Sequence, residues 1–271
     1  MNFLSAVLLG ILQGLTEFLP VSSSGHLVLA QHFFGIRENG DILFEVFVHL
    51  GTLFAVLIFF RKKIWGLLIS LFNWKNTVQN QTHRHNRLFL LYLAIATLAT
   101  GLIYLLFGKF FEAMYAQPLR VAFMLILTGI IIFISDSVRS TEIPASQMGS
   151  LRSVVIGIAQ GMAIIPGISR SGATISTSIF TGVKRRDAAE FSFLLSIPAI
   201  LGANLINIDK FMQLGTSQMG IYLGGFIAAF IAGYLVISLL IRLIVTANLK
   251  YFSFYCWSVA VTSIILILGG K

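Results

Sequence analysis

Long apolar stretches decide what this chain can fold into. Six of them are long enough to cross a membrane as helices, because the apolar core of a bilayer takes about 17–25 residues. The chain is 57% hydrophobic and 11% charged, whereas soluble proteins carry about 25% charged residues. The sequence therefore predicts an all-α integral membrane protein, with residues 1–271 forming a single membrane domain. The predicted transmembrane helices are 43–60, 88–107, 119–136, 188–207, 219–243 and 252–269.

Two further apolar stretches, 3–20 and 153–165, are shorter and run into polar segments. A second short apolar stretch follows each polar segment, at 25–34 and at 173–183. Non-helical backbone is tolerated at membrane depth only where protein or a cavity surrounds it. Because helix, break, helix is the pattern of a segment that enters the membrane and turns back, we predict two re-entrant helix pairs besides the six spans.

The distribution of Lys and Arg predicts an orientation, because these residues collect in cytoplasmic loops. If the loop 61–87 is cytoplasmic and both broken segments re-enter, 13 basic residues fall inside and 5 outside. Both termini then lie outside, and the two pairs enter from opposite faces. The same bias explains the net charge of +9, so no nucleic-acid partner is predicted.

The first residues lack the pattern of a cleavable signal peptide. The chain has a single cysteine, Cys256, which excludes an internal disulfide.

The two halves of the chain resemble each other. Residues 10–14 (GILQG) recur as 157–161 (GIAQG), and Pro20 with its serine run recurs as Pro166 with 169–172. The offset is 145 to 147 residues. Re-entrant pairs entered from opposite faces indicate an inverted-topology repeat, which places its binding site near the membrane midplane at the broken helices. We therefore expect the two breaks to meet in one pocket, and the predicted repeats are 1–136 and 150–271.

The polar breaks carry the groups of an anion site. The first break holds Glu17 and His26 with a run of serines, and the second holds Arg170 among hydroxyls. An ionisable residue at membrane depth costs several kcal/mol, so it indicates a functional site. A buried guanidinium needs an anionic partner, and its fork suits phosphate oxygens. The sequence predicts a site for a phosphorylated substrate; the alternative is that Arg170 only pairs with Glu17 and joins the two halves.

Several roles are open to the residues of the first break. Glu17 could bind a metal, activate a nucleophile or handle a proton. Gln13 lies one helical turn earlier and should share its face, although it could instead hydrogen-bond between helices. One of Ser22, Ser23 and Ser24 could be a nucleophile, but serines also cap and pack helices. His26 could act as an acid or base, or could pack against a neighbouring helix.

Four other polar residues lie in or beside apolar sequence and are expected to be structural. His32 and His49 have apolar surroundings. Glu45 and Glu190 occupy matched repeat positions near the starts of predicted spans. We expect each glutamate to make a structural hydrogen bond, with a supporting role in the site as the alternative.

Residues 13–26 (QGLTEFLPVSSSGH) resemble the first signature of the bacterial undecaprenyl-diphosphatase family, also called the bacitracin-resistance family. Residues 166–174 (PGISRSGAT) resemble its second signature, and 190–195 and Pro198 also match, so the likeness covers most of the chain. The resemblance implies removal of the terminal phosphate of undecaprenyl diphosphate, recycling the carrier lipid of peptidoglycan synthesis and conferring bacitracin resistance. It also implies a multi-pass protein of the bacterial cytoplasmic (inner) membrane, with its active site facing the periplasm or exterior.

The resemblance also assigns roles to residues. It makes Ser23 the nucleophile or a phosphate ligand, His26 a proton donor or acceptor, and Arg170 the phosphate clamp. The acidic pair of the family appears here as Gln13 and Glu17, which moves the metal or base role onto Glu17. A divalent cation, Mg²⁺ or Ca²⁺, is implied, and Mg²⁺ often binds mainly through substrate phosphates. The further predicted substrate ligands are Gln13, Ser22, Ser169, Ser171 and Thr174.

Two other functions fit parts of the sequence. A polyprenyl-phosphate transporter or flippase would use a similar pocket, because inverted repeats and broken helices are common in transporters. A lipid phosphatase of the phosphatidic-acid type shares Ser24-Gly25-His26 and Ser169-Arg170, but no histidine follows Arg170 at the short distance that type needs. The expected partners are a polyprenyl diphosphate and membrane lipids, and a homodimer is compatible with the sequence.

Overall fold

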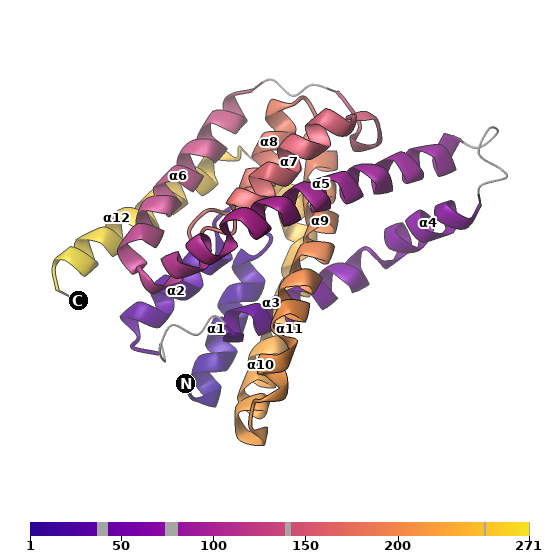
Figure 1. Ribbon diagram of the computed structural model, residues 1–271. Helices are drawn as coiled ribbons and strands as arrows, with labels where there is room; N and C mark the ends of the chain where they lie inside the picture. The colour runs from indigo at the N-terminus through magenta and orange to yellow at the C-terminus, as the bar shows by residue number, and fades with distance from the viewer. Residues whose placement is uncertain (37–42, 74–80, 139–141, 247, 271) are drawn as a thin grey trace.

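The computed structural model describes residues 1–36, 43–73, 81–138, 142–246 and 248–270. Four basic residues of the charge tally, Arg37, Lys75, Arg139 and Lys271, lie outside these ranges. Within them the fold is a bundle of helices (Figure 1), with one isolated β-bridge between Ile143 and Val183. The helices are α1 (Phe3–Thr16), α2 (Ser23–Phe33), α3 (Leu43–Phe59), α4 (Arg61–Phe72), α5 (Gln81–Glu112), α6 (Pro118–Ser137), α7 (Ser150–Met162), α8 (Arg170–Phe180), α9 (Arg185–Ile206), α10 (Ile208–Met212), α11 (Thr216–Thr246) and α12 (Lys250–Leu268), with short 3-10 turns η2 (Ala113–Ala116) and η3 (Ala145–Gln147).

Among the described residues, α5, α6, α9, α11 and α12 are each long and apolar enough to cross a membrane. They correspond to five of the six predicted spans. The sixth, 43–60, is α3, which has 17 residues and bends by 73° into α4. The all-α membrane fold is therefore confirmed. The prediction of a loop over 61–87 is wrong in part, because α4 and the first turns of α5 lie there; α4 has a basic start but an apolar remainder.

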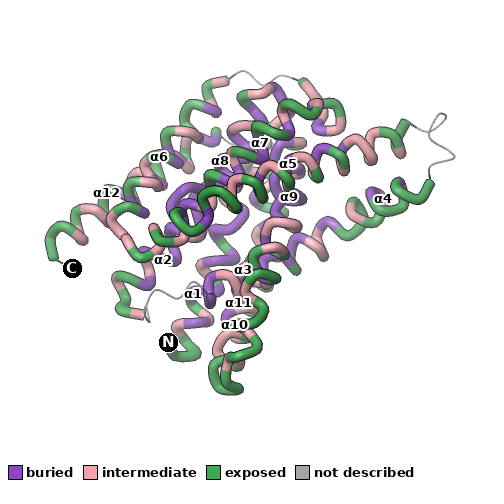
Figure 2. The backbone as a smooth tube through the Cα atoms, viewed as in Figure 1, coloured by how far each residue is buried: buried purple, intermediate pink, exposed green. Residues whose placement is uncertain are grey.

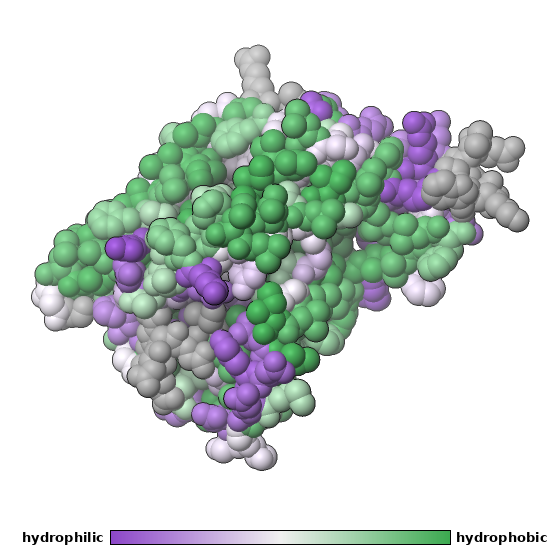
Figure 3. Space-filling model, viewed as in Figure 1, coloured by the Kyte–Doolittle hydropathy of each residue, from purple (hydrophilic) through white to green (hydrophobic). Residues whose placement is uncertain are grey.

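The surface of the bundle is largely apolar. Figure 3 shows hydrophobic residues over α5, α6 and α12, with hydrophilic residues gathered near the N-terminal end of α5 and again around α10 at the lower end of the bundle. Leu98 and Leu105 of α5 are 73% and 81% exposed, and Leu235 of α11 is 70% exposed. Soluble monomers rarely expose large continuous apolar patches, so this surface is suited to lipid.

Each predicted re-entrant segment is a helix, a break and a second helix. The four helices have 14, 11, 13 and 11 residues, too few for any one to cross a bilayer. Both second helices begin at a serine cap. Ser22 Oγ accepts from the Gly25 N–H (3.2 Å), and Ser169 Oγ accepts from the Gly172 N–H (3.0 Å). Figure 2 shows buried residues gathered in the centre of the bundle, where the two breaks lie.

The first helix of each pair packs on a long helix of the other half. A Cβ added to Gly10 of α1 would lie 2.2 Å from the carbonyl oxygen of Gly225 in α11. A Cβ added to Gly157 of α7 would lie 2.3 Å from the carbonyl oxygen of Ala96 in α5. Small residues allow such close approach between membrane helices. This exchange of partners supports two repeats, 1–136 and 150–271, and that division stays a prediction.

We expect Gly10→Ala to destabilise the protein by about 1–3 kcal/mol, because the methyl group would overlap backbone that cannot move aside. Gly220→Ala in α11 is the matched control, since nothing lies within 4 Å of the added Cβ. That change should stabilise the helix by about 0.5–1 kcal/mol. Thermal unfolding of both variants in detergent measures the difference, and an equal response of the two would contradict the close crossing.

Candidate active site

Glu17 lies at the centre of the polar groups, in the first break and only 5% exposed. Its Oε2 accepts from Gln13 Nε2 (2.8 Å) and from Ser23 Oγ (2.5 Å). His49 Nε2 lies 3.3 Å from the same oxygen. Its Oε1 forms an ion pair with Arg170 Nη2 from the second break. The two breaks therefore meet, as the repeat pattern predicted.

Arg170 is the first residue of α8, and the ion pair uses only part of its guanidinium. Its Nη1 is buried and has no hydrogen-bond partner. A buried donor left unpaired costs about 1–3 kcal/mol, and more when charged. The purely structural alternative, in which Arg170 only joins the halves, accounts for one arm of the guanidinium and not for the other. The free arm is suited to a second anion.

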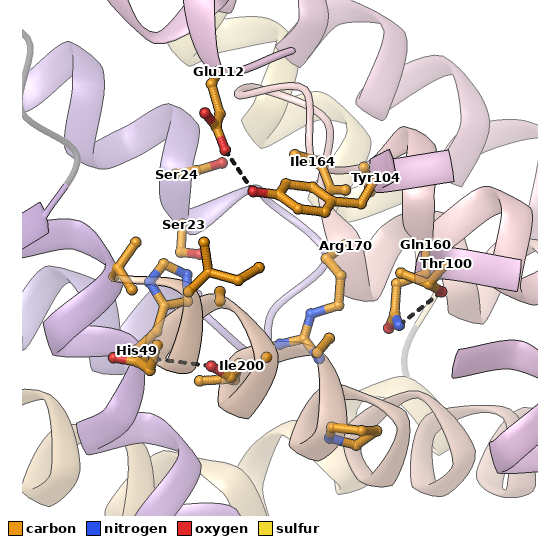
Figure 4. Close-up of a pocket in the computed structure, with 18 of the residues that line it drawn as sticks. Ser23, Ser24, His49, Thr100, Tyr104, Glu112, Gln160, Ile164, Arg170 and Ile200 are labelled. Carbon is orange, nitrogen blue, oxygen red and sulfur yellow. Dashed lines mark hydrogen bonds between the residues drawn. The ribbon is translucent and has the colours of Figure 1, made fainter. Parts of the chain in front are cut away.

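Glu17, Ser23, His49 and Arg170 lie on the wall of a cavity of about 420 Å³. Figure 4 shows Ser23, His49 and Arg170 around it. The first break, α3, α5, the second break and α9 all contribute to its wall. The wall is polar where Glu17 and Arg170 meet, and the rest is mostly apolar. Further polar side chains on it are Thr97, Thr100, Tyr104, Glu112, Tyr115, Gln160, Asn204 and Asn207. The apolar lining includes Val46, Ala163, Ile164, Ile168, Pro198, Ala199, Ile200, Ala203 and Ile206.

Most of the predicted site residues gather at the polar end. Ser22, Ser23 and Ser169 line the cavity beside Glu17 and Arg170. Ser22 and Ser169 use their hydroxyl groups as helix caps, whereas the Ser23 hydroxyl is directed at the carboxylate. Gln13 is fully buried behind Glu17 and orients it, and because it does not line the cavity, the structure does not support its prediction as a substrate ligand.

Ser171 and Thr174 do not line the cavity, so the structure does not support their prediction as phosphate ligands. Ser171 lies about 100° around the helix from Arg170, and its Oγ donates to the carbonyl oxygen of Leu19 (2.8 Å). Thr174 lies deeper in the bundle, with Oγ1 2.6 Å from Ser192 Oγ. Both residues hold α8 in place rather than facing a ligand.

His26 is also turned away from the cavity. Its Nδ1 lies 2.8 Å from the carbonyl oxygen of Ser22, and its Nε2 lies 2.9 Å from the hydroxyl oxygen of Tyr255 in α12. The two rings are stacked, with centroids 5.5 Å apart. In this arrangement neither ring nitrogen contacts Glu17, which does not fit the predicted role in proton transfer.

His49 is the histidine that the structure brings to the site, and sequence reasoning expected it to be structural. Its Nδ1 lies 2.5 Å from the carbonyl oxygen of Glu45. Because a carbonyl oxygen can only accept, Nδ1 carries a hydrogen and Nε2 is the nitrogen that faces Glu17. The signal that could have found His49 is its ionisable ring inside a predicted span.

A metal ion bound by the protein alone does not fit this site. Both carboxylate oxygens of Glu17 already face donors or cationic groups, including Arg170 and His49. The residues that the structure describes contain no group of three or more His, Cys, Asp or Glu side chains placed to hold a metal. Glu17 as a metal ligand therefore has no support from its surroundings.

Comparison with known proteins agrees with the resemblance that residues 13–26 and 166–174 carry. Residues 6–262 match the model of a family described as "Bacitracin resistance protein BacA". A protein named "Undecaprenyl-diphosphatase" from Carboxydothermus hydrogenoformans is 41% identical over 275 residues, covering 100% of both chains. Proteins of the same name from Syntrophotalea carbinolica and Methanobrevibacter smithii are each 40% identical and cover 95% and 96% of this chain, and 96% of their own lengths. The chain belongs to the bacitracin resistance protein BacA family.

Proposed function

We propose that this protein hydrolyses undecaprenyl diphosphate to undecaprenyl phosphate and inorganic phosphate. The observation that carries the proposal is the unpaired arm of Arg170, beside Glu17 and Ser23, in a cavity whose wall is otherwise mostly apolar. The polar end suits a phosphate, and the apolar wall suits a prenyl chain. The names of the relatives support the same substrate.

The chemistry follows from the contacts around Ser23. Its Oγ attacks the terminal phosphorus and forms a new P–O bond, while its proton passes to Glu17, 2.5 Å away. The bond from the terminal phosphorus to the bridging oxygen breaks, and its electron pair leaves with undecaprenyl phosphate. Water then attacks the phosphorus of the phosphoserine and the bond from Ser23 Oγ to phosphorus breaks. Inorganic phosphate leaves, and the proton held by Glu17 returns to Ser23 Oγ. In the alternative, a water held beside Ser23 attacks directly.

Arg170 stabilises the charge that develops on the transferred phosphoryl group, because phosphoryl transfer depends mainly on positioning and electrostatics. The N-termini of α2 and α8 support it. Both helices begin at residues that line the cavity, Ser23 and Arg170, and N–H groups at helix N-termini favour anions.

We also propose that the site faces the exterior of the cytoplasmic membrane. α5 and α9 begin among basic residues predicted to be cytoplasmic, such as Arg84 and Arg185. Both helices line the cavity with their C-terminal halves, at Tyr104 and Asn204. A site on that side would return the monophosphate carrier to peptidoglycan synthesis, and this would underlie bacitracin resistance.

The deciding experiment is release of inorganic phosphate from C55 or C15 polyprenyl diphosphate by the purified protein in detergent with Mg²⁺. We expect release by the parent and loss in Glu17→Ala. No two-sided membrane exists in detergent, so a transporter or flippase would release no phosphate. If folded parent protein releases no phosphate, the proposed hydrolysis is wrong and the transporter function is favoured.

We expect His49→Ala to lower kcat/KM by about 10–100-fold, because misplacement of a catalytic group by even about 1 Å can cost 100-fold. His49 is one of the groups that hold the Glu17 carboxylate in position. His32→Ala is the matched control, since His32 is exposed on α2. Phosphate release at saturating and low substrate measures both variants. An equal change in kcat/KM for the two variants would contradict a role for His49 in the site.

We propose that the divalent cation reaches the site with the diphosphate. Substrate-free protein should then bind Mn²⁺ or Mg²⁺ more weakly than about 1 mM in calorimetry, the weak end of protein cation sites. Chelation by EDTA should stop phosphate release, and added Mg²⁺ should restore it. Tight binding to substrate-free protein that Glu17→Gln abolishes would instead assign the metal to Glu17.

A further inference from the structure

A second carboxylate lies on the wall of the cavity. Of the acidic residues that the structure describes, Glu17 and Glu112 are the two that line it. Glu112 is the last residue of α5, and its Oε1 accepts a hydrogen bond from the hydroxyl group of Tyr104 (3.1 Å). In the view of Figure 4, Ser24 lies between Glu112 and Ser23. The second carboxylate is therefore on the same side of the cavity as the predicted nucleophile.

The helix is built to hold this carboxylate in place. Tyr104, Gly108 and Glu112 are spaced four residues apart, so they share one face of α5. A Cβ added to Gly108 would lie 2.7 Å from two atoms of the Tyr104 ring. Glycine at this position therefore lets the ring lie along the helix, where its hydroxyl group reaches Glu112. Glycine within a helix is unfavourable relative to alanine, so the contact is kept at a cost in helix stability.

Glu112 differs from Glu17 in its partners. Glu17 faces Arg170 and His49, whereas Glu112 forms no ion pair among the residues that the structure describes. Tyr115 connects the two glutamates, because its hydroxyl group interacts with Ser24 and the charges of both carboxylates act on it. The cavity thus holds one carboxylate with cationic partners and one without.

A carboxylate without a cationic partner opposes an anionic substrate. A diphosphate carries several negative charges, and like charges repel strongly where water is partly excluded. The one Lys or Arg side chain among the described residues of the cavity wall is Arg170, and Glu17 already shares its charge. A divalent cation between Glu112 and the diphosphate would turn this repulsion into attraction. Mg²⁺ is commonly held in this way, by one or two carboxylates together with substrate phosphates.

We propose that Glu112 is the protein ligand of the divalent cation that enters with the diphosphate. The cavity then selects the metal complex of the substrate over the free diphosphate. The inference rests on the proposed hydrolysis and adds a specificity-determining residue to it. It leaves Glu17 to Ser23 and Arg170, and a single carboxylate agrees with weak cation binding by substrate-free protein.

Binding of a substrate analogue tests this role without any hydrolysis. The analogue is C15 polyprenyl diphosphate with methylene in place of the bridging oxygen, and calorimetry measures its Kd with EDTA and with Mg²⁺. The parent should bind it at least about tenfold more tightly with Mg²⁺. In Glu112→Gln, binding in EDTA should become about tenfold tighter, as expected when a like charge about 10 Å away is removed at an effective dielectric constant of about 20. Mg²⁺ should then strengthen binding by less than about threefold.

Two controls carry the same substitution. Glu142→Gln changes a carboxylate that is 81% exposed and paired with Lys184, and it should bind the analogue as the parent does in both conditions. Glu17→Gln removes the other carboxylate of the cavity and should keep the strengthening by Mg²⁺. If Glu112→Gln does not fold, Glu112→Asp keeps the charge on a shorter side chain. That variant should bind as weakly as the parent in EDTA and lose most of the strengthening.

Two results would overturn the proposal. One is an unchanged effect of Mg²⁺ in folded Glu112→Gln. The other is weaker binding by this variant in EDTA, because lost repulsion must tighten binding, whereas damage to the cavity would weaken it. If the parent releases no phosphate from the true substrate, the proposed hydrolysis fails by itself. Binding of the analogue still decides the role of Glu112 in that case.

Discussion

Replacement of Arg170 by glutamine is expected to lower kcat/KM for phosphate release by at least about 1000-fold. Removing one preorganised donor from a transition-state site costs about 100–1000-fold, and this change also removes a full charge. The unpaired Nη1 is the arm assigned to the substrate, and the other arm holds Glu17. Both the phosphate contact and the position of the carboxylate are lost together.

Arg170→Lys separates charge from geometry. Lysine keeps the positive charge but cannot hold two anions with a planar fork. We expect it to retain more activity than glutamine and far less than the parent. Steady-state phosphate release in detergent gives both values, with thermal unfolding to show that the variants are folded. A kcat/KM of Arg170→Gln within tenfold of the parent would show that Arg170 does not act in phosphate transfer.

Ser23→Ala carries the second large effect, a loss of at least about 1000-fold in kcat if Ser23 is the nucleophile, since removal of a catalytic serine can cost far more. Ser24→Ala is the matched control. Ser24 lines the same cavity, but its Oγ lies 3.3 Å from Ser22 Oγ rather than at Glu17. Rapid acid quench with substrate labelled in the terminal phosphate should trap phosphoserine in the parent and none in Ser23→Ala. Normal turnover by Ser23→Ala would contradict attack by Ser23 and favour direct attack by water.

The membrane explains why much of the fold could be predicted from sequence. A bilayer requires long apolar helices and tolerates breaks only inside the protein, so the hydropathy pattern located α5, α6, α9, α11 and α12. The breaks were visible because they interrupt apolar sequence with Pro20 and Pro166. α4 was missed because its basic start, Arg61–Lys63, is also the mark of a cytoplasmic loop.

The site residues were predicted less completely, because sequence places a residue on a helix but not the direction it faces within the bundle. Glu17 and Arg170 were found since intramembrane charges require partners, and the structure pairs them. His26 was assigned to the site because it lies in the first signature, and His49 was set aside because its neighbours in sequence are apolar. Packing reverses these assignments, because Tyr255 holds His26 while α3 brings His49 to Glu17.

The exchanged packing of α1 and α7 determines when the site can form during synthesis. α1 emerges first but rests on α11, which ends at Thr246. Glu17, at the end of α1, can meet Arg170 earlier in synthesis, but the helix on which α1 packs is complete only after nearly the whole chain has been inserted. A chain truncated before Arg170 would hold an unsupported carboxylate in the membrane, so quality-control proteases should recognise it.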